Sequence, residues 1–256
     1  MDGPLLSVIT VTRDDRAGLA RTRASLDAQG WREFEWLVAD GGSTDGTLGD
    51  LARDPPHWWD SRVDGGPFGG MNRAMGQAQG RYLLFLNGGD RLAGPGVLAG
   101  VAAALRAGSP DLLYGDALED PGTGHLALKP SRHWRWVWYG MPAHHCAILY
   151  RRDLVADMEF DMSYRIAADY AFTLEAIRRA CRISRMPSAL AVFAPDGLSR
   201  RHAALGRQEQ DRIRAEILGL PQGVRRCISA LQFCMASLRS AHPAAYAYLR
   251  FGRKQS

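Results

Sequence analysis

The 256-residue sequence contains few cysteines and no long hydrophobic run. Its four cysteines have neither a CxxC spacing nor a dense framework, so we expect a reducing compartment and small core residues rather than disulfides. No apolar stretch approaches the roughly 20 residues that a membrane-spanning helix requires. The first residues, MDGPLLSVITV, lack the basic start and the cleavage site of a signal peptide, which favours a cytoplasmic protein.

Acidic residues are scarce in the C-terminal residues 200–256, so the net positive charge of the chain is concentrated there. Residues 200–256 hold 11 of the 32 lysines and arginines, but 3 of the 27 aspartates and glutamates. The rest of the chain is therefore mildly acidic, although the formal net charge is +5. This asymmetry indicates an anionic surface as the partner of the tail and argues against a nucleic-acid-binding body.

Strand-like segments alternate with helix-like segments over the first 120 residues. The strand-like segments are LLSVITVT (5–12), FEWLVAD (34–40), HWWDSRVD (57–64), RYLLFLN (81–87) and DLLYGDA (111–117). Helical patterns lie between them, and Ser43 or Thr44 is expected to cap the helix that follows the second strand. This alternation predicts an α/β fold with a mostly parallel central sheet and helices on both faces.

Polar residues follow three of these strands. Thr12, Arg13 and Asp14 end the first strand, Asp40 ends the second, and Asn87–Asp90 follows the fourth. In open parallel sheets the ligand crevice lies outside the carboxyl ends of the strands. We therefore expect the three polar tips to gather along that edge.

The segment Asn87–Asp90 reads Asn-Gly-Gly-Asp and delivers a carboxylate on a backbone that glycine allows to bend. Carboxylate oxygens suit Mg²⁺ or Mn²⁺, especially where substrate phosphates complete the coordination shell. One acid is sufficient for a metal that is shared with a diphosphate. The alternative is a turn in which Asp90 caps the next helix.

The segment ADGGSTDGT (39–47) has Asp40 at a strand end, two glycines in a turn and the start of a helix. Two interpretations remain open at this point. Either Asp40 accepts hydrogen bonds from a nucleotide base or ribose, or the segment is a well-built strand-to-helix turn.

Together these motifs resemble the family 2 glycosyltransferases of the GT-A fold. The matching segments are SVITVT, DGGSTDGT, DGGPFGGMNRAMGQAQGRYLLFLNGGD, YGD, MPAHHCAILYRRDL and YRIAADYAFTLEAI, which together span about residues 5–199. The order of six segments is more specific than any single motif. The resemblance is closest to the branch that acts in bacterial exopolysaccharide, lipopolysaccharide or glycolipid synthesis, where Asn-x-Gly-Asp often replaces Asp-x-Asp.

The resemblance implies an inverting, Mn²⁺- or Mg²⁺-dependent transfer of a sugar from a nucleotide-diphosphate donor to a hydroxyl of a glycan or lipid-linked acceptor. It assigns Asp169 as the catalytic base, Asp90 as the metal ligand and His145 to the acceptor or diphosphate side. It places the nucleotide sugar against Thr12, Arg13, Asp14, Asp40, Asp64, Asn72, Arg73 and Asn87. The alternatives are an N-cap role for Asp169, at the start of DYAFTLEAIRRA, and a structural hydrogen bond for His145.

The resemblance, together with the basic composition of the tail, divides the chain into three regions. Residues 1–115 are expected to form the nucleotide-sugar-binding half, and residues 116–199 the acceptor-binding and catalytic half of the same domain. Residues 200–256 are expected to form a basic helical extension.

The chain departs from the family where GIYDAMN is common and GPFGGMN stands here, so that a tyrosine hydroxyl is absent at Phe68 and an acid at Gly69. Asn87 also replaces the first acid of the metal motif. These losses keep open a catalytically silent sugar-nucleotide-binding partner of another transferase. A nucleotidyltransferase is disfavoured because VTRDDRAG lacks the expected glycine-rich loop, and a dinucleotide oxidoreductase because no GxGxxG follows the first strand.

In the tail, VRRCISALQFCMASLRS predicts an amphipathic helix, since apolar residues recur at spacings of three and four. The recurring residues are Val224, Ile228, Leu231, Met235 and Leu238, and the arginines that flank them are Arg225, Arg226 and Arg239. One interpretation packs this helix on the catalytic domain. The other docks it on an anionic membrane surface, at the inner face of the plasma membrane, where a lipid-linked acceptor would reside.

Overall fold

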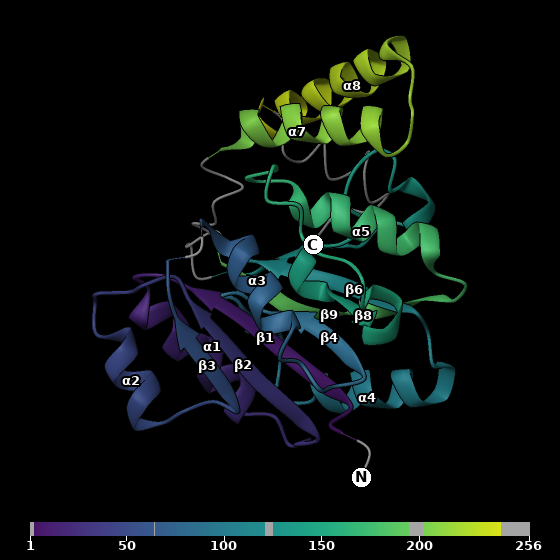
Figure 1. Ribbon diagram of the computed structural model, residues 1–256. Helices are drawn as coiled ribbons and strands as arrows, with labels where there is room; N and C mark the ends of the chain where they lie inside the picture. Colours follow the sequence, from purple (N-terminus) through teal and green to yellow (C-terminus); the bar gives the residue numbers. More distant parts are fainter. Residues whose placement is uncertain (1–2, 64, 121–124, 195–201, 242–256) are drawn as a thin grey trace.

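The computed structural model describes residues 3–63, 65–120, 125–194 and 202–241. A sheet lies at its centre, in the strand order β3-β2-β1-β4-β8-β6-β9-β5, with β7 paired to β6 (Figure 1). The strands are β1 (Leu6–Thr12), β2 (Phe34–Asp40), β3 (Trp58–Ser61), β4 (Tyr82–Phe85), β5 (Arg91–Leu92), β6 (Leu112–Glu119), β7 (Ala127–Lys129), β8 (Ile148–Arg151) and β9 (Ile183–Phe193). The helices are α1 (Arg16–Asp27), α2 (Thr47–Arg53), α3 (Pro67–Met75), α4 (Val97–Gly108), α5 (Ala168–Arg179), α7 (Ala203–Glu216) and α8 (Gln222–Ala241).

The first four strands of the sheet are parallel, as the sequence predicts. β1 pairs in parallel with both β2 and β4, and β2 pairs in parallel with β3. Beyond β4 the pairing is mixed, because β8 runs antiparallel between β4 and β6, and β5 and β7 form antiparallel edges. The reversal of β8 brings its first residues beside the carboxyl end of β4, so that residues just before β8 reach the edge where the parallel strands end.

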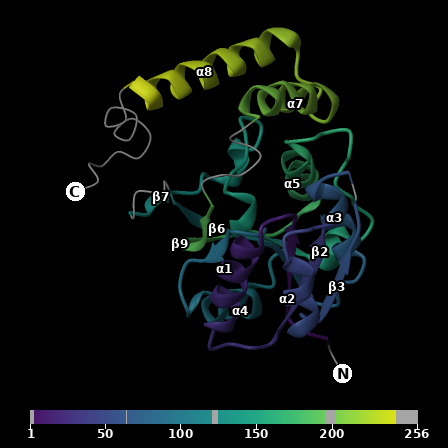
Figure 2. The same cartoon turned by 90° about the vertical axis from the view of Figure 1, so that its left-hand side faces the viewer.

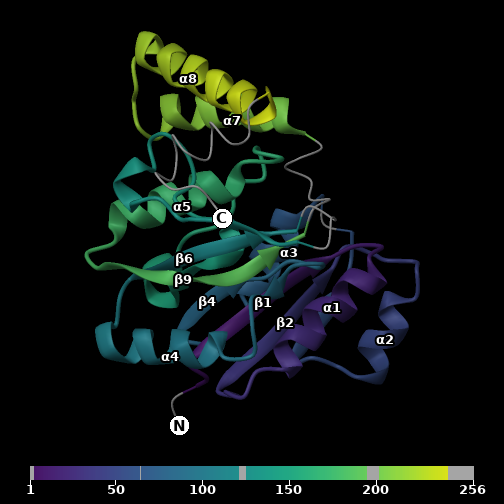
Figure 3. The ribbon, with the colours of Figure 1, turned by 180° about the vertical axis from the view of Figure 1, so that it is seen from behind.

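Two hydrophobic layers cover the sheet, which confirms the prediction of helices on both faces. Ile9 and Val11 of β1 point into a core shared with α3 and α5. Leu6 and Val8 point into a second core shared with α1, α2 and α4. Figure 3 shows these helices from behind the view of Figure 1. This alternation follows the two-residue repeat of a strand. The fully buried strands thus hold their carboxyl ends rigidly in place.

The start of α2 differs from the sequence prediction. The helix follows Gly46, and the side chain that bonds to its first turn belongs to Asp45, whose Oδ1 accepts from Thr47 N at 3.1 Å. Ser43 and Thr44, which were expected to cap it, instead bond to residues at the tips of β1 and β2. Because Ser43 and Thr44 are held by Asp14 in the turn that follows β2, the helix begins later in the chain, at Thr47.

The cysteines also differ from expectation. Cys146 is buried, as predicted, but Cys181, Cys227 and Cys234 are exposed, and all four are free thiols. Cys181 is exposed because it lies between the end of α5 and the start of β9, and Cys227 and Cys234 are exposed because they lie on outward faces of α8.

The C-terminal helices form a layer at one end of the molecule, with α7 next to α5 and α8 outermost (Figure 2). Ile213 and Arg214 of α7 are fully buried, and Ile228 of α8 is nearly so. The predicted amphipathic helix is confirmed as α8, whereas the basic segment YLRFGRK (248–254) lies outside the described residues. Within the described part of the chain, no helix is both long and apolar enough to cross a membrane.

Candidate active site

The turn after β2 is built around the carboxylate of Asp40. This residue is fully buried, and its carboxylate accepts hydrogen bonds from Gly42 N and Ser43 N, both at 2.8 Å. The hydroxyl groups of Ser43 and Ser61 donate to the same carboxylate. In this conformation Asp40 serves the turn, so its contact with a nucleotide base stays a prediction.

The tip of β1 is joined to this turn. Asp14 has a left-handed backbone with φ of 48°, its N–H donates to Ser43 Oγ at 2.7 Å, and its Oδ1 accepts from Thr44 N at 2.7 Å. The side chain of Arg13 lies against Gly41, where an added Cβ would stand 3.2 Å from Arg13 Cβ. The side chains of Arg13 and Asp14 are 64% and 45% exposed. The two strand tips thus form one surface that presents a guanidinium and a carboxylate to solvent.

The tip of β4 joins the same surface. Gly88 N donates to Val11 O at 2.9 Å, beside the end of β1. Thr22, in α1, donates to Asp90 O at 2.7 Å and accepts from Gly89 N at 3.1 Å. Thr22 was not predicted as part of the site. The sequence feature that could have indicated it is a polar residue on the inner, apolar face of the helix. The expected gathering of the three tips is therefore observed.

Two polar atoms at these tips have no hydrogen-bond partner among the described residues. They are Thr12 Oγ1 and Asn87 Oδ1, and both are buried. Orphaned polar atoms of this kind are rare in native proteins and commonly point to a ligand, ion or water. Here both atoms are oxygens at adjacent strand ends.

Asp90 adds a carboxylate to these oxygens. It is 3% exposed, its Oδ1 accepts from Ala194 N at 2.9 Å, and burial raises its pKa to about 7. In the described part of the chain, no cluster of three or more histidines, cysteines, aspartates and glutamates could hold a metal ion alone. The oxygens of Asp90 and Asn87 therefore fit a hard divalent cation only where oxygens of a ligand complete the shell.

The two predicted residues of α3 are both bonded to the protein. The amide of Asn72 makes two hydrogen bonds with the backbone of Phe160, at 2.9 and 2.8 Å, and so anchors α3 to the second half of the chain. Arg73 pairs with Asp60 at 3.0 Å, at the end of β3. Asp64 lies outside the described residues. Arg73 thus has its charge at the carboxyl edge, and contact of any of the three with a nucleotide stays a prediction.

Asp169 lines a small cavity on the other side of the β4 tip. Because α5 begins at Ala168, Asp169 lies in the first turn rather than at the N-cap, which corrects the alternative considered above. Its Oδ1 accepts from Tyr170 N at 2.8 Å. The cavity has a volume of about 120 Å³ and is lined by Lys129, Pro130, Met141, Pro142, Ala143, His144, His145 and Asp169. Burial raises the pKa of Asp169 to about 6, with a smaller contribution from the charge of Glu209.

His145 connects this cavity to the tip of β4. Its ring stacks on Phe85, the last residue of β4, with centroids 4.9 Å apart. Burial lowers its pKa to about 3, so the imidazole is neutral at physiological pH. Its Nε2 is buried and has no hydrogen-bond partner among the described residues. His145 thus stands between Asp169 and the segment that begins at Asn87.

Two further polar residues of the cavity, Lys129 and His144, were not predicted. Lys129 Nζ lies 2.9 Å and His144 Nε2 3.3 Å from Glu119 Oε1 at the end of β6. The His144 ring also stacks on Phe193 at the end of β9, with centroids 4.6 Å apart. The adjacency of the two histidines was the one available signal, and nothing in the sequence around Lys129 indicated a site.

The structure therefore brings the predicted residues together in two groups. The tips of β1, β2 and β4 form the first, and Asp169 with His145 forms the second. Asp40 and Asp90 do not line the cavity of Asp169. The two groups share the carboxyl edge of the sheet and meet through the contact of His145 with Phe85. Such an edge can bind an anionic ligand on one side and supply a base on the other.

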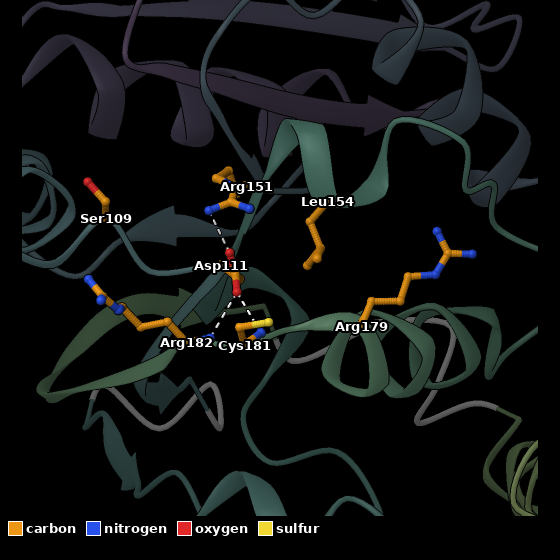
Figure 4. A pocket seen from close by; sticks show the side chains of 7 residues that line it. All are labelled: Ser109, Asp111, Arg151, Leu154, Arg179, Cys181 and Arg182. Carbon is orange, nitrogen blue, oxygen red and sulfur yellow. Dashed lines mark hydrogen bonds and ion pairs between the residues drawn. The ribbon is translucent and has the colours of Figure 1, made fainter.

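A larger cavity, of about 400 Å³, lies at the opposite edge of the sheet (Figure 4). It is lined by Ser109, Asp111, Arg151, Leu154, Arg179, Cys181 and Arg182. Asp111 pairs with Arg151 at 2.6 Å and accepts from the backbone N–H groups of Cys181 and Arg182. Arg182 donates to Gly108 O at the end of α4. These charges hold strand and helix ends together, and the cavity contains none of the predicted site residues.

A family model and the sequences of known proteins both match this chain to glycosyltransferases. The model of glycosyl transferase family 2 matches residues 7–157. A protein of Mycobacterium tuberculosis called an uncharacterized glycosyltransferase is 34% identical over 183 residues, which cover 68% of this chain and 69% of that protein. A PGL/p-HBAD biosynthesis glycosyltransferase of Mycobacterium bovis is 30% identical over 200 residues, which cover 72% and 74%.

Solved structures resemble the whole described fold. S. aureus TarS, solved in complex with UDP-GlcNAc, has a TM-score of 0.70 and 24% identity, and the match covers 96% of this chain and 76% of that one. A mannosyltransferase of Pyrobaculum calidifontis, solved with GDP-Man and Mn²⁺, has a TM-score of 0.66 and 14% identity, with coverage of 96% and 78%. At these identities the likeness concerns the fold.

The raised pKa of Asp169 gives a testable effect on stability. An acid whose folded pKa is raised favours folding below its unfolded pKa, near 4, and that contribution is lost as the pH rises through about 6. Asp169→Asn, which cannot ionise, is therefore expected to raise the free energy of unfolding at pH 8 by about 1–2 kcal/mol, after allowance for partial exposure, and to change it little at pH 4. Urea unfolding at the two pH values measures both.

Asp40→Asn is the matched control. Its carboxylate receives four hydrogen bonds from the turn, so the amide places a donor against other donors and is expected to lower stability by about 1–3 kcal/mol at pH 8. Loss of stability in both variants at pH 8 would contradict the assignment of Asp169 as a strained, desolvated carboxylate.

Proposed function

The chain belongs to glycosyl transferase family 2 and has a GT-A fold, and on this premise we propose that it moves a sugar from a nucleotide-diphosphate donor to an acceptor hydroxyl with inversion at the anomeric carbon. The observation that carries the proposal is the carboxylate of Asp169, desolvated in a cavity at the sheet edge where the oxygens of Thr12 and Asn87 lack partners. The acceptor is a glycan or a lipid-linked glycan.

The donor side is assigned to the strand tips. The complexes of TarS with UDP-GlcNAc and of the mannosyltransferase with GDP-Man support a nucleotide sugar as the donor class. We assign the nucleotide to the surface formed by Arg13, Asp14 and the turn after β2, and the diphosphate to the neighbourhood of Thr12, Asn87 and Arg73. Arg73 would contribute positive charge as negative charge grows on the leaving diphosphate.

The cation side is assigned to Asp90 with Asn87. The mannosyltransferase complex with Mn²⁺ supports a divalent cation in this fold. When bound, Mn²⁺ or Mg²⁺ would act as a Lewis acid that offsets charge on the diphosphate oxygens. Because burial raises the pKa of Asp90 to about 7, a cation competes with a proton for this carboxylate, and cation binding is expected to weaken as the pH falls below 7.

The chemical step is assigned to Asp169. Its carboxylate accepts the proton of the acceptor hydroxyl while the hydroxyl oxygen forms a bond to the anomeric carbon and the bond to the diphosphate oxygen breaks. Attack from the face opposite the leaving group gives inversion. A pKa of about 6 suits this role, since the group is ionised at pH 7 and yet more basic than an ordinary aspartate. Neutral His145, on the floor of the same cavity, faces the acceptor or the diphosphate.

The acceptor class rests on the relatives and on the cavity. The mycobacterial PGL/p-HBAD biosynthesis glycosyltransferases support a glycolipid-type acceptor. The second candidate is a silent partner that binds the donor without transfer. It is favoured by Phe68, whose ring stacks on Phe160 in the core at 5.6 Å and offers no hydroxyl, and by the absence of an acid at Gly69.

Asp169→Asn is expected to fold normally and to lose at least about 10²-fold in transfer rate, because a positioned base contributes about 10²–10⁴-fold. The measurement is sugar transfer or donor hydrolysis with Mn²⁺ across a panel of UDP, GDP and dTDP sugars. At saturating Mn²⁺, which removes the effect of proton binding to Asp90, the wild-type rate is expected to rise with pH through about 6 as Asp169 ionises.

The outcomes separate the two candidates. Near-wild-type turnover by Asp169→Asn would remove Asp169 as the base. Donor binding by the wild type without turnover, over a range of acceptors, would favour the silent partner. Asp111→Asn, in the cavity at the opposite edge, is the control that is expected to affect stability and leave donor specificity unchanged.

We further propose that α8 docks on an anionic membrane surface. Its inner face is fixed to the body, since Ile228 is buried and Gln232 donates to Tyr139 O at 2.7 Å. Its exposed apolar residues lie on two sides of the helix, because Leu231, 51% exposed, is one turn from Ile228, whereas Phe233, 66% exposed, projects from the opposite, outer side. On the outer side Phe233 lies near Arg226, whose charge complements anionic lipid, whereas Arg225 pairs with Asp211 of α7.

Replacement of Phe233 by serine is expected to weaken binding to vesicles of phosphatidylglycerol and phosphatidylcholine about tenfold or more, because burial of this side chain is worth about 1.5–3 kcal/mol. Vesicle flotation of the full chain measures this, with Leu126→Ser, an exposed leucine on the body, as the control. Equal flotation of both variants and the wild type would remove the membrane proposal.

A further inference from the structure

The C-terminal helix α7 is bonded directly to the segment that leads into Asp169. The carboxylate of Glu209 is 7% exposed and accepts three backbone hydrogen bonds. Arg165 N donates to Oε1 at 2.8 Å, and Ile166 N and Ala167 N donate to Oε2 at 2.9 and 2.8 Å. Three consecutive N–H groups, at the entry to α5, are thus held by one side chain that is more than 40 residues away in sequence.

Helix α7 approaches the segment 165–167 closely because its residue 206 is a glycine. Gly206, one turn before Glu209, lies against Ile166, and a Cβ at Gly206 would stand 3.1 Å from Ile166 Cγ2. A side chain at position 206 would require Ile166 or the helix to shift by a few tenths of an ångström, so glycine favours the close approach by which Glu209 reaches the backbone of the segment. The contact therefore depends on two residues of α7 and involves no surface ion pair.

The same helix also fixes the opposite wall of the cavity. Arg214 is fully buried, and its guanidinium donates to Trp138 O at 2.9 Å and Tyr139 O at 2.7 Å. It also lies over the ring of Tyr170, 5.8 Å from the centroid. The chain continues from Tyr139 into Met141–His145, which lines the cavity. One helix thus holds both the segment before Asp169 and the segment that faces it.

We propose that Glu209 is a positioning residue for the proposed base Asp169, so that the C-terminal extension is part of the active site. Glu209 fixes the backbone from which Asp169 projects and adds a negative charge close to its carboxylate. The catalytic role of Asp169 rests on the proposed function. The effect of Glu209 on the position and the pKa of the Asp169 carboxylate does not.

The charge of Glu209 acts in the same direction as burial. Burial is the main cause of the raised pKa of Asp169, and the charge of Glu209 raises it further. The groups that face Asp169 from the elements around it are Glu209 of α7, Tyr150 of β8, Lys129 of β7 and the two histidines His144 and His145. Of these, Glu209 combines a negative charge with bonds to the backbone of Asp169's own segment.

Glu209→Gln tests both parts of the role. The amide carbonyl can still accept from Ile166 N and Ala167 N, but its NH₂ group faces Arg165 N, and the charge is lost. We expect the pKa of Asp169 to fall, and the acid limb of the pH–rate profile to move to lower pH with it. We also expect kcat to fall about 10-fold or more with the donor KM changed less than twofold, because the donor surface is on other elements.

The pKa is read by NMR titration of the full chain with ¹³C-labelled aspartate carboxyls, assigned with Asp169→Asn, and this readout does not require turnover. Glu209→Asp keeps the charge but is one methylene shorter, so it is expected to lose kcat while the pKa of Asp169 stays near that of the wild type. Asp211→Asn, which breaks the pair of α7 with Arg225 of α8, is the control and is expected to shift neither.

A folded Glu209→Gln variant that matches the wild type in both kcat and the titration of Asp169 would overturn the proposal. Absence of turnover by the wild type with every donor would instead count against the proposed function, and the titration would still decide the role of Glu209. Thermal unfolding of each variant checks that the comparison is made on folded protein.

Discussion

The site depends on the position of β4, which pairs in parallel with β1 on one side and antiparallel with β8 on the other. A parallel neighbour ends at the same edge as β4, so Thr12 comes to lie beside Gly88 and Asn87. An antiparallel neighbour begins at that edge, so His145 comes to stack on Phe85. The pairing of one short, buried strand therefore brings the proposed donor surface and the cavity of Asp169 together, although their residues are far apart in sequence.

Groups at this edge are arranged at a cost to stability. Two oxygens lack partners among the described residues, and the carboxylates of Asp90 and Asp169 are held where burial opposes their ionised forms. Asp40 shows the contrast, because four donors satisfy a carboxylate that is even more deeply buried. Unsatisfied groups beside a satisfied one are typical of a site that is completed by a ligand, whereas Asp40 has the bonding of a structural residue.

Much of the fold followed from the sequence, and less of the site did. Continuous apolar strands and polar tips placed Thr12, Asn87 and Asp90 correctly at one edge, because burial and strand direction are local properties. No local pattern encodes the pairings between distant segments. On these depend the antiparallel direction of β8, the place of Lys129 in the cavity, and the hydrogen bonds of Glu209 to the backbone before α5. The tight hydrogen bonding of Asp40 and Asn72 was likewise hidden, since an aspartate or asparagine at a turn reads the same whether it binds a ligand or its own backbone.

The proposed cation and diphosphate bind at the β4 tip, next to the cavity of Asp169. A crystal structure of the full chain with Mn²⁺ and UDP, in which the metal is located by its anomalous scattering, tests this arrangement. We expect a manganese peak beside Asp90, with diphosphate oxygens near Thr12 and Asn87. A peak elsewhere, such as the cavity around Asp111 at the opposite edge, or UDP bound away from the strand tips, would contradict it.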